Sequence, residues 1–228
     1  MKFYRWFLSA ILCLLSAIAC AQENLPVCFN YGCSSEIVVV IGKQQMAVIA
    51  ELFKHIENSE QERDAMAQAI AAMYRYAAGL TPIWADKPGN LADEETQGRM
   101  DCIDHSRTTT AMLKIMEKNH LLKYHRILPS VRRNRVIFQH FSAAIEVLGE
   151  DAETARYAAL MLADCGSNCN DAHHMNSFSR TQNDANNTPA VSARGQRFVI
   201  DSWFVAPGEA PVIMPLDDWL NGGGPDVW

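Results

Sequence analysis

The segment DCIDHSRTTTAMLKIMEKNHLL occupies residues 101–122 and contains neither glycine nor proline. Its apolar residues Met112, Ile115, Met116 and Leu122 recur at the spacing of one helix face. The three threonines at 108–110 lower the intrinsic helix propensity, because β-branched side chains lose rotamers in a helix. The pattern therefore predicts a helix that begins at Cys102 and that depends on tertiary packing.

Two further helices are predicted before this segment. Apolar residues recur every three or four positions over residues 43–56 and again over 66–77, and Gly79 follows the second run, as helix C-termini prefer. Between the runs, the sequence SEQE has the pattern of a capping box. In that box Ser59 and Glu62 would satisfy backbone N–H groups at the start of the second helix.

Strands are predicted on both sides of a long insertion. Residues 136–147 and 197–204 are rich in β-branched and aromatic side chains, and the first of these runs follows a basic turn at 132–135. Residues 151–196 between them are predicted to form a short helix and then a surface loop rich in Asn, Ser, Asp and Gly. We expect this loop to be mobile and to be cleaved before the core in limited proteolysis.

The composition fits a single α+β domain over residues 22–228. The chain has 228 residues, of which 49% are hydrophobic and 20% charged, so it can bury an ordinary core. Residues 22–42 are expected to be irregular apart from a short strand at 37–41. A net charge of -6 argues against a nucleic-acid partner, because phosphate binding relies on a basic surface.

Residues 1–21 have the pattern of a secretory signal peptide. Basic residues precede an apolar run at 6–19, and Ala19-Cys20-Ala21 offers small residues for cleavage. The run is short for a membrane span, and no other stretch approaches the roughly 20 apolar residues that a span needs. The mature chain is therefore expected in the periplasm or outside the cell, with lipid attachment at Cys20 as the alternative form of processing.

Removal of the signal peptide would leave five cysteines in an oxidising compartment, so at least one thiol stays unpaired. Cys28 and Cys33 bracket a turn-like segment, and so do Cys165 and Cys169, which suggests two local disulfides. Cys102 remains as the unpaired thiol.

The cluster Cys165, Cys169, His173 and His174 offers a rival interpretation, because two thiolates and two imidazoles could bind zinc. Export favours a disulfide, and the spacing matches no zinc-finger pattern. We therefore expect neither a metal nor a cofactor. Four other histidines lack ligand spacing and are expected to be structural or exposed: His55, His105, His120 and His125.

A cysteine at a helix N-terminus is chemically special, because free backbone N–H groups and the helix dipole favour the thiolate. A nucleophile of this kind also needs a base and a group that orients the base. His140 on one predicted strand and Asp201 on the other could supply them if the strands are neighbours.

These residues resemble the transglutaminase-like cysteine peptidases of bacteria: the helix-opening DCIDH at 101–105, the strand sequence HFSAA that begins at His140, and VID that ends at Asp201. The resemblance covers about 105 residues, from Gln97 to Trp203. It implies a papain-like architecture, in which a central nucleophile helix packs against an antiparallel sheet.

By the same resemblance Cys102 would be the nucleophile, His140 the general base and acid, and Asp201 the orienting carboxylate. The family usually places the aspartate shortly after the histidine, so the additional residues here must leave the sheet as the insertion. The Cys102 backbone N–H and the side chain of Gln97 are candidate oxyanion donors. Asp101 and Asp104 are too few acids for a calcium site and are expected to cap the helix.

The sequence thus predicts an exported thiol hydrolase or acyl transferase that acts on amide or peptide bonds of a protein or peptide substrate. Hydrolysis and amide transfer share one acyl-enzyme and differ in whether water or an amine attacks it. The alternative is a non-enzymatic periplasmic binding or assembly protein that retains the fold.

Overall fold

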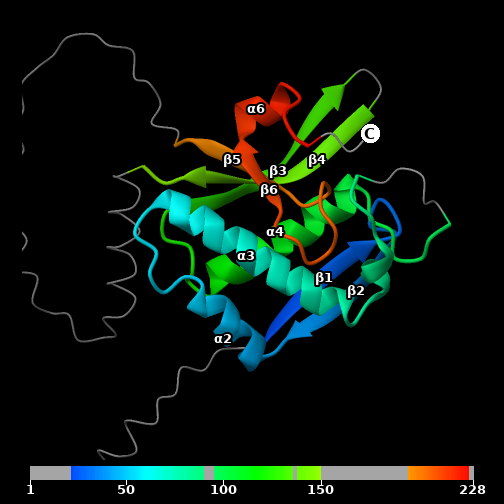
Figure 1. The fold of residues 1–228 in the computed structure, drawn as a ribbon, viewed down its shortest axis with the longest axis horizontal. Helices are drawn as coiled ribbons and strands as arrows, with labels where there is room; N and C mark the ends of the chain where they lie inside the picture. Colours follow the sequence, from blue (N-terminus) through cyan, green and yellow to red (C-terminus); the bar gives the residue numbers. More distant parts are fainter. Residues whose placement is uncertain (1–21, 90–94, 136–137, 150–194, 226–228) are drawn as a thin grey trace, which may run out of the picture.

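The computed structural model describes residues 22–89, 95–135, 138–149 and 195–225. These parts of the chain form a mixed α+β structure with two antiparallel sheets (Figure 1). The expected signal peptide and most of the expected insertion, including the cluster from Cys165 to His174, lie outside the described residues.

The chain begins with a β-hairpin where an irregular segment was expected. Strands β1 (Glu23–Phe29) and β2 (Ser35–Ile41) pair antiparallel from Glu23 opposite Ile41 to Phe29 opposite Ser35. The prediction of a short strand at 37–41 is confirmed, but the prediction of irregular structure before it is wrong. Leu25, Val27 and Phe29 alternate along β1 and are all buried, the pattern of a strand with one face in the core.

The predicted helices are present as α2 (Lys43–Glu51), α3 (Ser59–Ala78) and α4 (Cys102–Lys118), with a short 3-10 helix, η1 (Pro82–Ala85), before α4. The predicted capping box at the start of α3 is wrong. Asn58 is the N-cap and accepts a hydrogen bond from the Gln61 N–H (2.9 Å). Glu62 is instead fully buried and accepts from His125 Nδ1 (2.7 Å).

A four-stranded antiparallel sheet follows the helices. Its strands, in spatial order, are β3 (His125–Arg135), β4 (Phe138–Val147), β5 (Arg197–Asp201) and β6 (Val212–Pro215), and the short helix α6 (Leu216–Leu220) follows β6. The predicted basic turn at 132–135 is wrong, because these residues lie in β3 and pair with β4. β3 is an edge strand of this sheet, where basic side chains discourage pairing with another chain.

Helix α4 lies in the centre of the described structure (Figure 1). It packs against the hairpin through β1, against the larger sheet through β3 and β4, and against α3. Three residues of α4 are completely buried in the main core cluster: Met112, Leu113 and Met116. This packing stabilises α4 even though its three threonines lower the intrinsic helix propensity.

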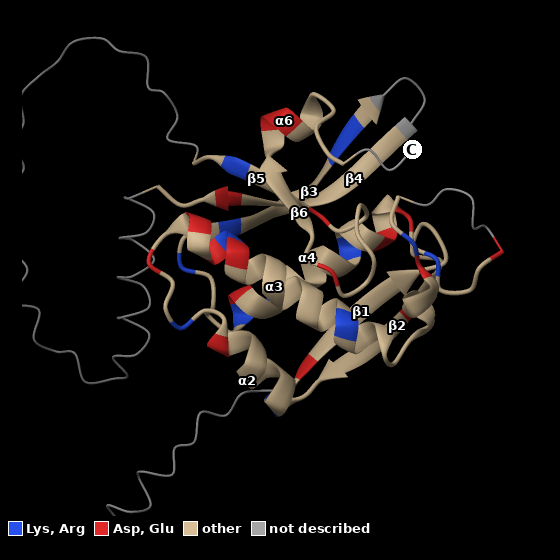
Figure 2. Ribbon diagram, in the orientation of Figure 1, with Lys and Arg blue, Asp and Glu red and all other residues tan. Residues whose placement is uncertain are grey.

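Acidic and basic residues are interspersed over helices and strands (Figure 2). No helix within the described residues is both long enough and apolar enough to cross a membrane.

Candidate active site

Cys102 is the first residue of α4, as the sequence predicted. The Asp101 carboxylate is the N-cap and accepts hydrogen bonds from the backbone N–H groups of Ile103 (3.0 Å) and Asp104 (2.9 Å). The Asp104 carboxylate accepts in return from the Asp101 N–H (3.1 Å). The two acids therefore form a capping box at the start of α4, in agreement with the capping role expected for them.

His140 and Asp201 meet because β4 and β5 are neighbours in the sheet. The His140 Nε2 atom lies 2.7 Å from Asp201 Oδ2. The carboxylate is 1% exposed and the imidazole 13%, so a partly accessible ring rests on a buried acid. Since Nε2 faces the carboxylate, Nδ1 is the ring nitrogen that remains for a second partner.

The Asp201 carboxylate has further donors. Trp219 Nε1 donates to Oδ2 (2.8 Å), and the Trp203 backbone N–H donates to Oδ1 (3.3 Å). Trp219 belongs to α6, which Arg133 of β3 fixes by donating to the Trp219 carbonyl (2.6 Å) and stacking on the indole. These donors hold the Asp201 carboxylate in place beside His140.

Three aromatic side chains surround the His140 ring. The ring centroids of Trp203, Phe204 and Trp219 lie 4.8, 5.5 and 5.5 Å from that of the imidazole. The imidazole thus contacts three aromatic rings as well as Asp201. This packing limits both its rotation and its contact with water.

The Cys102 sulfur lies against the backbone of β4 next to His140. Its thiol donates to the carbonyl of Gln139 (3.8 Å), the residue before His140. The N–H of Phe141, the residue after His140, also bonds the sulfur. The nucleophile candidate and the base candidate are therefore positioned by the same short piece of strand.

The electrostatics of Cys102 differ from the expectation for a helix N-terminus. Burial raises the pKa of the thiol to about 11, and the carboxylates of Asp101 and Asp201 also raise this pKa. Hydrogen bonds from the N–H groups of Phe141 and of Cys102 itself lower it by less. The sulfur is therefore a thiol at neutral pH, because desolvation outweighs the effect of the helix terminus.

Gln97, the candidate oxyanion donor, lies in the turn before α4, and its side chain is exposed. The Cys102 N–H, the other candidate donor, is at the helix N-terminus. Their role as a pair stays a prediction.

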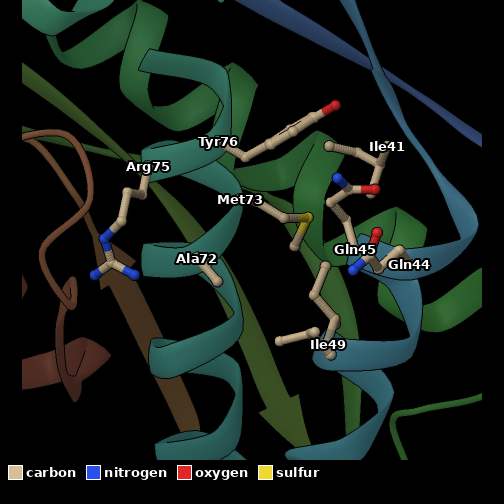
Figure 3. Close-up of a pocket in the computed structure, with 9 residues that line it drawn as sticks. Ile41, Gln44, Gln45, Ile49, Ala72, Met73, Arg75 and Tyr76 are labelled. Atoms are coloured by element: carbon tan, nitrogen blue, oxygen red, sulfur yellow. The ribbon is translucent and has the colours of Figure 1, made fainter. Parts of the chain in front are cut away.

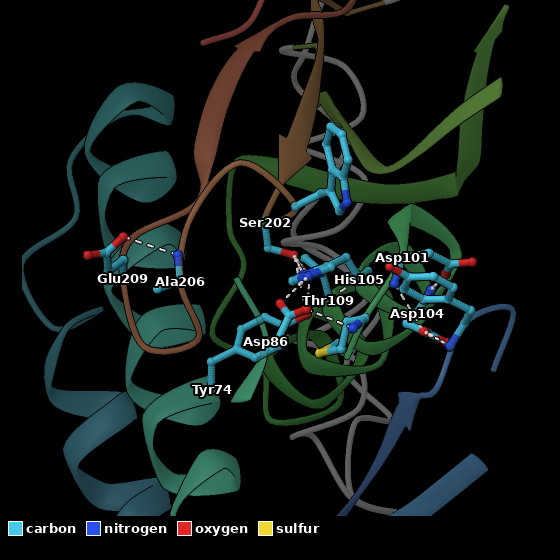
Figure 4. Close-up of polar contacts among 12 residues, drawn as sticks. Tyr74, Asp86, Asp101, Asp104, His105, Thr109, Ser202, Ala206 and Glu209 are labelled. Atoms are coloured by element: carbon cyan, nitrogen blue, oxygen red, sulfur yellow. Dashed lines mark hydrogen bonds and ion pairs between the residues drawn. The ribbon is translucent and has the colours of Figure 1, made fainter. Parts of the chain in front are cut away.

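The structure also contains a buried polar network that the sequence did not predict (Figure 4). His105 of α4 joins Asp86 through Nε2 (3.0 Å) and Ser202 through Nδ1 (3.0 Å). Ser202 also bonds Thr109 (2.8 Å), and the Tyr74 hydroxyl contacts both. The network connects α4 to the residue that follows Asp201, and no local sequence signal joins positions so far apart.

The other histidines agree with their expected structural or exposed character. His55 and His120 are exposed. His125 is completely buried, where it bonds Glu62 and lies 3.4 Å from Arg63 Nη1.

Of the two expected disulfides, Cys28–Cys33 is present, and Cys102 is a free thiol. Cys165 and Cys169 lie outside the described residues. Within the described parts, Cys28, Cys33 and Glu36 form the one group with the spacing of metal ligands. Its two sulfurs are bonded to each other and are not available as thiolates, so this group does not fit a metal while the disulfide is intact.

Two cavities lie away from the candidate triad. One, of about 410 Å³, is formed by the end of β2 with α2 and α3, and it is lined by the apolar Met73 and Ile49 and by the polar Gln44 and Gln45 (Figure 3). The other, of about 560 Å³, runs beside α4 and is lined in part by Arg107, Lys114 and Lys118. Neither cavity includes Cys102, His140 or Asp201 in its lining.

The chain matches no family model, no curated protein and no solved structure.

Proposed function

We propose that the chain is an exported thiol hydrolase or acyl transferase of the transglutaminase-like class, with a papain-like fold, acting on amide or peptide bonds of a protein or peptide. The observation that carries this proposal is the 2.7 Å contact between His140 Nε2 and Asp201 Oδ2, beside the β4 backbone that touches the Cys102 sulfur. A cysteine at a helix start, with a histidine and an acid on neighbouring strands, is the constellation that acyl transfer by a thiol requires.

In the proposed reaction, the Cys102 sulfur attacks the carbonyl carbon while Nδ1 of His140 accepts the thiol proton. Asp201 orients the ring through Nε2 and stabilises the imidazolium that forms. The imidazolium then protonates the leaving amine, and the acyl group stays on the sulfur until water or an amine removes it. Because the pKa of the thiol is about 11, this proton transfer accompanies the attack and does not precede substrate binding.

The proposal can be tested with an activated ester, because the natural acyl donor is not needed to detect an acyl-enzyme. The mature protein is mixed with p-nitrophenyl acetate and quenched in acid, and the acetylated residue is located by peptide mass spectrometry. We expect acetylation of Cys102 in the wild-type protein and no acetylation of position 102 in the Cys102→Ala variant. His140→Ala should slow the reaction by about 10²–10⁴-fold, the usual contribution of a general base.

Matched controls separate the site from general effects of substitution. His55→Ala and Asp64→Asn change exposed residues of the same types and should acetylate at the wild-type rate. Asp201→Asn should slow acetylation, whereas an unchanged rate in both His140→Ala and Asp201→Asn would exclude the triad. The non-enzymatic binding or assembly protein would then be the better interpretation.

A second measurement distinguishes hydrolysis from transfer. A primary amine added to the acetyl-enzyme becomes acetylated if the enzyme is a transferase. If free acetate is the sole product at high amine concentration, the enzyme is a hydrolase.

A further inference from the structure

The turn between β1 and β2 has an unusual backbone. Asn30, Tyr31, Gly32 and Cys33 have φ values of 65°, 63°, 66° and 59°, so four consecutive residues are left-handed. Glycine adopts this conformation readily and asparagine occasionally, but the side chains of Tyr31 and Cys33 disfavour it. Interactions elsewhere must therefore hold the turn in place.

The backbone N–H groups of this turn point at the two carboxylates that flank Cys102. Tyr31 N–H and Cys33 N–H donate to the two oxygens of Asp104, at 2.9 and 2.5 Å. Gly32 N–H donates to Asp101 Oδ2 at 2.8 Å. Successive N–H groups around one concavity form an anion-binding nest, and here the anions belong to the chain itself.

The same turn also holds the segment that leads into α4. The Asn30 N–H donates to the Arg99 carbonyl (2.7 Å), and the Asn30 side chain accepts from the Gly98 N–H (2.9 Å). The Cys28–Cys33 disulfide closes the turn across its base. The residues on both sides of Cys102 are thus fixed by one disulfide-closed ring.

We infer that the oxidised Cys28–Cys33 turn is the device that positions Cys102 for attack, so that activity requires this pair oxidised while Cys102 stays reduced. The inference rests on the proposed function. Asp101, Asp104 and the turn are positioning residues, because they act on the reaction through the start of α4.

The physical reason is the cost of leaving Asp104 without donors. Its carboxylate is fully buried, and burial together with Asp101 already raises its pKa to about 6, while bonds from the Asp101, Cys33 and Tyr31 N–H groups oppose this rise. Once the disulfide opens, the left-handed residues can relax and turn their N–H groups away. Loss of these donors raises the pKa of the Asp104 carboxyl further, the capping box weakens, and the first turn of α4 loosens around Cys102.

The redox step balances with a dithiol as reductant. Dithiothreitol supplies two electrons and two protons to the Cys28–Cys33 bond, which becomes two thiols, and the reductant becomes a cyclic disulfide. Cys102 is already a thiol and is unchanged. Reductant, which protects most thiol enzymes, should therefore inactivate this one.

The test compares acetylation of Cys102 by p-nitrophenyl acetate before and after dithiothreitol treatment, with the reductant removed before the assay. We expect the rate to fall by about tenfold to a hundredfold, as expected when a reacting group is slightly misplaced. Far-UV circular dichroism at the assay temperature should show that the helices remain. The Cys28→Ser/Cys33→Ser variant should be slow before treatment and should not respond to it.

Two controls make the result specific. The Cys165→Ser/Cys169→Ser variant removes the other expected pair and should retain both the full rate and the response to dithiothreitol. Cys102 of the Asp104→Asn variant should be acetylated slowly, and reduction should slow it no further. The reason is that the turn acts through the Asp104 carboxylate, which the substitution has already removed. A merely structural disulfide would instead give independent, additive losses.

The inference and the proposed function can fail separately. If His140→Ala slows acetylation but neither reduction nor Cys28→Ser/Cys33→Ser does, the triad stands and the positioning role of the turn is wrong. If Cys102 is not acetylated in the oxidised wild type, the proposed function itself is wrong.

Discussion

At the scale of single residues, the protonation state of Cys102 separates two mechanisms. A thiolate paired with an imidazolium is ready before substrate binds, whereas a thiol must lose its proton during attack. Partial burial of the sulfur, with the Asp101 and Asp201 carboxylates nearby, raises its pKa and favours the thiol. In the proposed reaction, the hydrogen bond between His140 and Asp201 would orient the imidazole as the base.

The alkylation rate of Cys102 should therefore keep rising through the alkaline range to a midpoint near pH 11, because iodoacetamide reacts with the thiolate. His140→Ala should leave this midpoint in place, because burial and the Asp101 and Asp201 carboxylates are what raise the pKa of Cys102. The measurement is the rate of labelling against pH, followed by intact-protein mass spectrometry. A plateau below about pH 8.5, lost in His140→Ala, would show a resting ion pair instead.

Asp104 should make stability depend on pH. Its pKa is raised to about 6 in the folded chain, so the folded state binds a proton more tightly than the unfolded state does. The contribution of Asp104 to the free energy of unfolding is then highest at low pH and falls as pH rises from about 4 to about 6. Urea unfolding at several pH values should show this fall, and Asp104→Asn should remove that part of the slope. An identical slope in the variant would contradict the raised pKa.

At the scale of elements, the starts of α3 and α4 show two ways to cap a helix. α4 has a true capping box between Asp101 and Asp104. α3 has the sequence of a box, but Asn58 caps it and Glu62 turns into the core. There Glu62 accepts from the N–H groups of Lys123 and Tyr124 and from His125, which joins α3 to the start of β3.

Asn58→Ala should therefore lower the free energy of unfolding by about 1 kcal/mol, the usual cost of losing an N-cap. Ser59→Ala, one residue later, is the matched control and should change it by less than about 0.5 kcal/mol. Urea unfolding monitored by circular dichroism measures both. If Ser59→Ala lowers the free energy of unfolding more than Asn58→Ala does, Ser59 is the cap, as the sequence predicted.

At the scale of the whole molecule, α4 connects the hairpin to the larger sheet. Its buried face contributes to one core cluster that includes Leu25 and Val27 of β1 and Ala143 and Ile145 of β4. The position of Cys102 therefore depends on packing on two sides of the helix. The same core holds the strand that carries His140.

Leu113→Ala should lower the free energy of unfolding by about 2–5 kcal/mol, because the side chain is completely buried and its removal leaves a cavity. Lys114→Ala changes the next, exposed residue and should have little effect. Since one core joins both sheets, near-UV and far-UV circular dichroism should report the same urea midpoint in each protein. Separate midpoints would mean that the hairpin and the larger sheet unfold independently.

Local patterns were enough for much of the fold. Helical spacing predicted α2, α3 and α4, including the start of α4 at Cys102, and β-branched content predicted β4 and β5. β1 was missed because Asn24 and Pro26 interrupt its apolar residues, although their alternation was visible. β3 was missed because its basic residues resemble a turn, and only pairing with β4 makes them a strand.

The sequence by itself determined where α4 begins, which cysteines can form a local disulfide, and which residue types could carry acyl-transfer chemistry, because each depends on neighbours along the chain. Tertiary structure alone decided the contact of His140 with Asp201, the high pKa of Cys102 and the hold of the disulfide turn on Asp101 and Asp104. These depend on burial and on hydrogen bonds between residues about 40 to 70 positions apart, which exist only when the strands pair and α4 packs between them.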